Sequence, residues 1–380
     1  MSNLEDDVSL IDEITEVRSL PSAAARIATL EALLQRAEAD ELYNSAIFAR
    51  VALAADAVMS NADDLAPALG LLAESQQRAR ERPDDLISPT ISLLLILTQA
   101  ILHLLLHHPE IPLDRVELLR RNYEDFCKQH GMTLRGACAL AMTIAARRGD
   151  HAAAQRLFMQ SQAQPRSDYL AADTVSDAIG WYAGRGLDAE ALQLYGQADP
   201  NTERHYYSYV LTNSLIPAQR SGRTELAARL YEESLDHHDD LDSGHGSMLS
   251  YLAIAGRYDD GLALIPLLTR PAGDDTDWSR AEIAEHLVVL LSHLQAAGRG
   301  DEPVSKMDAT VDELLERYRS VAERTARQID QVNKMDVVLR RLHAFWAEHC
   351  PAAHLRAQVE SRSAPPTAPP TPRSSTSRTK

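Results

Sequence analysis

The chain has 380 residues and a formal net charge of −17, and 45% of its residues are hydrophobic. This apolar content is enough for a sizeable core and excludes a disordered protein for all but the C-terminal tail. A body this acidic repels phosphate backbones, so we expect protein or peptide partners, basic ones included, and no nucleic acid.

Apolar residues recur at three- and four-residue spacing along almost the whole chain, and no segment alternates as a β-strand does. This pattern predicts an all-α protein whose helices break at Pro or Gly. Connections of two to eight residues make consecutive helices antiparallel neighbours. The predicted helices cover residues 4–19, 22–38, 41–59, 63–82, 90–107, 112–130, 133–148, 150–163, 168–184, 188–198, 202–220, 224–237, 246–255, 258–269, 278–297 and 305–349.

The first predicted unit, residues 1–130, is an N-terminal helical region with degenerate repeats. Its acidic start lacks the features of a signal peptide, and the three scattered cysteines of the chain indicate a reducing compartment. We therefore expect a cytoplasmic protein.

One segment of this first unit is unusually apolar. Residues 90–107 carry no formal charge and are strongly apolar from Ile91 to Leu106. Spanning a bilayer takes about twenty such residues. We therefore expect a buried core helix here, with membrane insertion as the alternative.

The second predicted unit, residues 131–300, contains four blocks with one order of residues. A glycine is followed five positions later by a small residue, and four positions after that by a large apolar one. The glycines lie 37, 36 and 34 residues apart, a period typical of stacked helix pairs. Glycine permits a tight reversal, the small residue lets two helix axes approach, and the large side chain fills the space beside it. The blocks are Gly149, Ala154 and Phe158; Gly186, Ala191 and Tyr195; Gly222, Ala227 and Tyr231; and Gly256, Gly261 and Ile265.

These blocks resemble the tetratricopeptide repeat family over about residues 133–270, and more loosely elsewhere. The family's first-helix Trp and its Leu-Gly pair are absent, whereas Tyr182 keeps its first-helix Tyr. The resemblance implies a right-handed superhelical solenoid of antiparallel helix pairs. It also implies a concave groove in which exposed positions of the first helices contact a protein or peptide. The groove positions that it assigns are Thr143, Arg147, Asp173, Ser176, Tyr209, Thr212, Gln219 and Arg220.

The third predicted unit, residues 301–360, contains a long helical stretch without Gly or Pro. Its apolar residues follow a four-three spacing until Asp336 falls on the seam, which indicates two helices that bend near Asn333. We expect this unit to cap the solenoid, because a terminal element needs a polar outer face. The alternative is a homodimer through a coiled-coil seam in 305–349. Residues 361–380 are rich in Pro, Ser and Thr and carry four basic residues, which predicts a disordered tail.

Common catalytic signatures are absent from the sequence: there is no Gly-rich phosphate loop, HExxH, GxSxG or paired CxxC. We therefore expect no catalytic residues, no metal site and no cofactor.

Two groups of histidines could still bind a metal ion. His103 and His107 lie one helical turn apart, but no third ligand stands near them in the sequence. Residues 237–245 gather three His and three Asp, which is either a solvated loop or a metal-dependent enzyme site. The spacing of Arg280 and His286 occurs in some helical ribonucleases but is common by chance in this composition.

The sequence thus favours a protein- or peptide-binding adaptor or regulatory scaffold that is not an enzyme. A narrower hypothesis is a peptide-sensing regulator of a bacterial signalling pathway. The alternative from a different class is a metal-dependent all-helical enzyme that uses residues 237–245. The acidic charge either attracts a basic partner or only keeps an apolar-rich molecule soluble.

Overall fold

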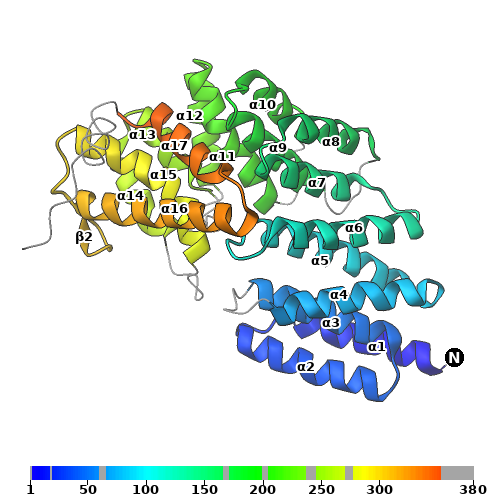
Figure 1. The fold of residues 1–380 in the computed structure, drawn as a ribbon. Helices are drawn as coiled ribbons and strands as arrows, with labels where there is room; N and C mark the ends of the chain where they lie inside the picture. Colours follow the sequence, from blue (N-terminus) through cyan, green and yellow to red (C-terminus); the bar gives the residue numbers. More distant parts are fainter. Residues whose placement is uncertain are drawn as a thin grey trace, which may run out of the picture.

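The computed structural model describes residues 2–17, 19–59, 66–165, 171–198, 204–236, 245–269 and 277–351 (Figure 1). These residues form seventeen α-helices, one short 3-10 helix and a two-stranded β-ladder. The all-α class predicted from the apolar periodicity is confirmed.

The first half of the chain folds into helices that stack one on the next, coloured blue to cyan in Figure 1. The α-helices among them begin and end close to their predicted bounds, because Pro, Gly and short polar residues mark the breaks, whereas the 3-10 helix η1 was not predicted. They are α1 (Ser2–Val17), α2 (Ala23–Ala39), α3 (Tyr43–Met59), α4 (Ala66–Glu81), η1 (Pro83–Asp85), α5 (Ser88–His107) and α6 (Leu113–Gln129).

The second half continues the stack and ends in two helices that turn back over the preceding ones (Figure 1). Its helices are α7 (Arg135–Arg147), α8 (His151–Ala163), α9 (Ala171–Ala183), α10 (Asp188–Tyr195), α11 (Arg204–Arg220), α12 (Thr224–Leu235), α13 (Ser247–Ile254), α14 (Tyr258–Leu268), α15 (Asp277–Ala296), α16 (Val311–Asn333) and α17 (Val337–His349).

The helices pack in a regular order. Each odd-numbered helix from α1 to α15 contacts the even-numbered helix that follows it. Each odd-numbered helix up to α13 also contacts the next odd-numbered one. Helices α1, α3, α5, α7, α9, α11, α13 and α15 therefore form one continuous row, which we call the odd-helix row.

The repeat glycines end the first helix of their pairs in the left-handed backbone conformation. Their φ angles lie between 70° and 74°, which a residue without Cβ adopts at little cost. After Gly222, for example, the Arg223 amide donates to the Ala218 carbonyl over 2.9 Å, as in a Schellman turn. The same turn follows α6 at Gly131 and α15 at Gly298, beyond the four blocks seen in the sequence.

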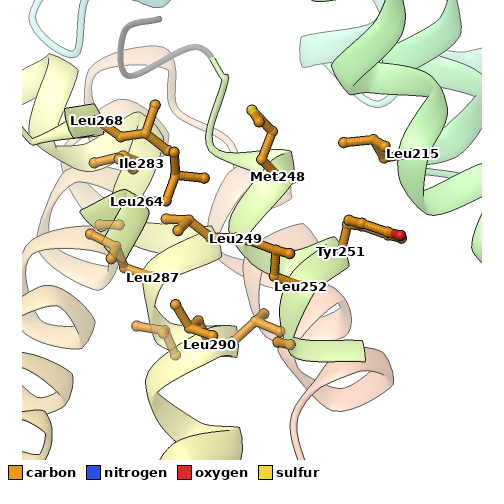
Figure 2. Packing of buried hydrophobic residues seen from close by; sticks show 14 of the residues in the cluster. Leu215, Met248, Leu249, Tyr251, Leu252, Leu264, Leu268, Ile283, Leu287 and Leu290 are labelled. Carbon is orange, nitrogen blue, oxygen red and sulfur yellow. The ribbon is translucent and has the colours of Figure 1, made fainter. Parts of the chain in front are cut away.

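The small and large residues of the four blocks lie in the core, with Tyr195 alone among them half-buried. Gly261 has no space for a side chain, because an added Cβ would lie 2.7 Å from Leu290 Cδ1. Figure 2 shows this part of the core, where Leu249 of α13 packs beside Leu264 of α14 and the leucines of α15. Packing between pairs therefore supplies much of the buried surface, as expected for stacked repeats.

The start of the C-terminal unit differs from its prediction. Residues 303–310 form a hairpin in which β1 (Pro303–Val304) pairs antiparallel with β2 (Ala309–Thr310). Lys306 and Asp308 adopt positive φ there, so the prediction of a helix from residue 305 is wrong up to Thr310. From that point a capping box between Thr310 and Glu313 starts α16. The bend predicted near Asn333 is confirmed, with Lys334 in the left-handed conformation between α16 and α17.

Helix α5 is the one described helix that is long and apolar enough to cross a membrane. In this structure 56% of its most apolar stretch is buried within the protein. It packs against α3, α6 and α7, and Leu94, Ile101 and Leu105 belong to the core that these helices share. Helix α5 is therefore packed as a core helix.

Candidate functional site

The eight residues that the sequence assigned to a groove come from α7, α9 and α11, which are neighbours in the odd-helix row. Two of them, Ser176 and Thr212, are buried. Asn213 Nδ2 donates to Ser176 Oγ over 2.9 Å, and Ser247 Oγ donates to the Thr212 carbonyl over 2.9 Å. Both residues lie between consecutive first helices, so the expectation that they are exposed ligand contacts is wrong.

Polar side chains link α5, α7 and α9 on one side of the row. Thr143 Oγ1 lies 3.4 Å from Asp177 Oδ2, and His103 Nδ1 of α5 lies 3.5 Å from the same oxygen. Arg147 donates to the carbonyl of Leu106 at the end of α5. The sequence identified Thr143 and Arg147 but missed Asp177, which lies one turn after the predicted Asp173. The side chain of Asp173 is outside those that the structure describes.

The same side of α5 carries an apolar stripe. Leu93, Ile96 and Ala100 are half-buried, and Leu104 is 41% exposed. Their three- and four-residue spacing places them on one face of the helix. We call the surface that they form with the polar group the α5–α9 face, and it consists of Leu93, Ile96, Ala100, His103, Leu104, Thr143, Arg147 and Asp177.

Tyr209 lies near the start of α11 and contacts the start of the next first helix. Its ring stacks on that of His245 with 4.5 Å between centroids, and Ser208 Oγ lies 2.8 Å from His245 Nε2. His245 is the one residue of the predicted metal cluster that the structure describes, and it is fully buried in this contact. Residues 237–244 lie outside the described residues, among which no group of three or more potential metal ligands occurs.

Helices α11 and α13 expose almost none of their surface. Every residue from Ser247 to Ala253 is buried, and most of α11 from Val210 to Ala218 is buried as well. A helix buried on all sides must be covered by further structure.

Helix α17 lies against this half of the row and docks on α15. Trp346 is buried, and its Nε1 donates to the Glu285 carbonyl over 3.0 Å. The Phe345 ring meets the His286 ring edge-on at 5.3 Å between centroids. Leu342, Trp346 and Cys350 of this end of the chain belong to the same core as α9–α15. The buried face of an amphipathic helix therefore rests on the row.

Helix α17 also reaches the ends of two other first helices. Glu348 forms an ion pair with Arg220 at the end of α11, with 2.8 Å between Oε1 and Nη1. A Cβ at Gly149 would lie 3.3 Å from Val337 Cγ2, so the start of α17 touches the turn after α7. The predicted groove residue Arg220 thus contacts a helix, but one from its own chain. Gln219 beside it is half-buried.

The two C-terminal helices join distant parts of the chain. Helix α16 packs along α15, and its Asn333 Oδ1 accepts a hydrogen bond of 2.6 Å from the Leu113 amide at the start of α6. Six of the seven seam residues that predicted a dimer are buried within this chain, and the seventh, Val332, is half-buried. The six are Val311, Leu315, Tyr318, Ala322, Thr325 and Ile329.

Burial beneath α17 changes the titration of several groups. Burial lowers the pKa of His286 and of His349 below the ordinary value of a histidine. Burial also raises the pKa of the Cys350 thiol to about 11. The docked state therefore favours neutral imidazoles and a protonated thiol.

No protein-family model matches the chain, and no curated protein shows significant sequence similarity to it. The tetratricopeptide resemblance rests on the repeat residues of the sequence.

Proposed function

We propose that the chain is a protein-binding scaffold and that the odd-helix row is its binding face. In this proposal the stacked pairs form a right-handed superhelical solenoid of the tetratricopeptide type, with the row on the concave side. The repeated left-handed glycine turns and the regular contacts between pairs support this architecture.

The observation that carries the proposal is the docking of α17. This amphipathic helix follows α16, packs on α15 and α16 through an apolar face, and reaches the row through polar contacts with Glu285 and Arg220. Grooves that bind partner helices use the same combination of buried apolar residues and peripheral polar contacts. The α5–α9 face belongs to the same row and presents apolar side chains to solvent.

The chemistry of the α5–α9 face indicates an amphipathic partner segment. Its apolar stripe is bordered by Asp177, which accepts hydrogen bonds, and by the guanidinium of Arg147. The net charge of −17 favours approach of a basic segment over an acidic one. A scaffold of this kind acts as an adaptor or regulator in the cytoplasm, and a peptide-sensing regulator would use the same face for a short peptide.

Two matched substitutions test the proposal in the full-length protein. Leu104 of α5 is 41% exposed on the proposed face, whereas Leu118 of α6 is 60% exposed on an even-numbered helix. Leu104→Asp should remove a bound partner from affinity preparations made in the native host, and Leu118→Asp should retain it. Retention of every co-purified protein by Leu104→Asp would contradict the proposal.

A further inference from the structure

We infer that α17 is a displaceable internal occupant of the binding face, and that the partner binds through an amphipathic helix of the same pattern. This inference rests on the proposed function and names the partner's chemistry and a means of regulation.

Among the described residues, helix α17 is the last helix and has no second helix after it. The row of first helices ends at α15, which already has its second helix in α16. Helix α17 follows after a short connection at Lys334–Asp336 and packs on both α15 and α16. It also reaches Arg220 at the end of α11, so it lies across the odd-helix row.

The anchors of α17 define a recognition pattern. Leu342 and Trp346 lie one turn apart on the buried face, and Phe345 lies beside them against His286. Glu348 contacts Arg220 at the edge. A partner helix that makes the same contacts would carry the order Leu-x-x-Phe-Trp-x-Glu. Tryptophan and phenylalanine are typical anchors because they bury a large area with few rotatable bonds.

The outer side of α17 and its connection to α16 permit release. Arg340, Arg341, Ala344 and Ala347 face solvent, so the opposite side of the helix packs on α15 and α16. Helix α16 keeps its own contacts with α15 and, through Asn333, with α6. Release of α17 at the helix break therefore costs its contacts with α15 and with Asp330 and Glu323 of α16, while α16 itself stays packed.

The position of α17 also connects the two halves of the row. Its first residue, Val337, touches the turn after α7, next to the α5–α9 face. A partner helix longer than α17 that follows the same path would extend from α15 to this face. One bound partner helix would then both displace α17 and contact Leu104.

Binding in trans tests the inference with full-length proteins. The probe is a fluorescent peptide of residues 335–351, and the proteins are wild type, Leu342→Asp and Ala344→Asp. Both substitutions place one Asp in α17, but Leu342 is buried and Ala344 is exposed. The peptide should bind Leu342→Asp about tenfold or more tightly than the other two proteins, and a peptide with Trp346→Ala should lose that binding.

Thiol labelling of Cys350 and circular dichroism provide the structural controls. Leu342→Asp should keep its helical signal and expose the Cys350 thiol, which is buried in the wild type. If Leu342→Asp does not fold, Glu348→Arg replaces it, because this change loosens α17 through Arg220 without entering the core. Equal peptide binding to all proteins, or none to a folded variant with exposed Cys350, would overturn the inference.

The outcomes separate this inference from the proposed function. If the peptide does not bind but a partner is lost in Leu104→Asp, the inference that α17 is displaceable is overturned and the proposed scaffold function is kept. If the peptide binds but no partner depends on Leu104, the proposed scaffold function is overturned and the inference that α17 is displaceable is kept.

Discussion

Among single residues, Gly222 after α11 serves backbone conformation and not space. Gly222 has φ 71°, and an added Cβ would meet no atom within 4 Å. Gly222→Ala should therefore lower the free energy of unfolding by about 1 kcal/mol, the cost of a side chain in the left-handed region. Urea unfolding measures this change.

The matched control is Gly70→Ala in the middle of α4, where the added Cβ also has open space and φ is not positive. Alanine should stabilise this helix by up to about 1 kcal/mol. Changes of the same sign in the two variants would show that the left-handed turn is not the reason for Gly222.

Two histidines under α17, the buried His349 and the half-buried His286, make its docking sensitive to pH. His286 faces Ser250 of α13 and is near Glu285 and Arg341, and His349 is near Glu348, Arg220 and Asp188. Burial lowers the pKa of both imidazoles in the docked state. Undocked histidines take up protons below about pH 6.5, so docking is strongest above that pH and weakens as the pH falls further.

Labelling of Cys350 between pH 7.5 and 5.5 measures this dependence, after correction for the intrinsic reactivity of the thiol. The accessible fraction should rise on acidification in the wild type and less in His286→Gln, which removes one of the two imidazoles. Identical profiles for the two proteins would contradict a role for His286.

At the scale of helices, the sequence predicts boundaries well and long-range contacts poorly. Asp188 and Thr224 begin their helices as expected, because each starts a run of helix-forming residues after a glycine turn. The hairpin at 303–310 was missed, since strands of two residues show no alternation.

The exposure of the candidate groove residues was predicted in part, because burial between helices is a long-range property. Thr143 and Arg147 lie on the accessible side of the row, but Ser176 and Thr212 are buried by the neighbouring helices of the stack. Which face of a first helix meets its neighbour depends on the stacking angle, which local periodicity does not contain. The contact of Glu348 with Arg220 joins residues 128 positions apart, and no local pattern indicates it.

One carboxylate holds the start of α17. Asp330 is buried, and its oxygens accept hydrogen bonds of 3.0–3.1 Å from the amides of Val337, Val338 and Leu339. Asp330→Ala should leave these amides unpaired and destabilise docked α17 by about 1–3 kcal/mol. Increased labelling of Cys350 reports the loss.

Asp336→Ala is the control for this prediction. Asp336 stands at the N-cap of α17, but its side chain makes no capping hydrogen bond and is 84% exposed. Its removal should change stability by less than about 0.5 kcal/mol. Equal labelling of Cys350 in the two variants would contradict the role given to Asp330.

In the molecule as a whole, one row of first helices runs from α1 to α15, and the C-terminal helices connect its end to the start of α6. The half of the row near α11–α15 is covered by α17, and the half formed by α5–α9 exposes apolar side chains. This division is the basis of our proposal that one chain presents a partner surface and also holds a helix of its own. The central claim is that a partner binds on this row and not on the even-numbered helices.

Site-specific photo-crosslinking in the native host tests that claim most directly. A photoreactive amino acid is placed at Leu104 of α5 in one full-length protein and at Leu118 of α6 in another. Both side chains are exposed, so the reagent can reach a bound protein from either position. We predict one discrete adduct with a partner protein from position 104 and none from position 118. The same adduct from both positions, or an adduct from position 118 alone, would contradict the claim.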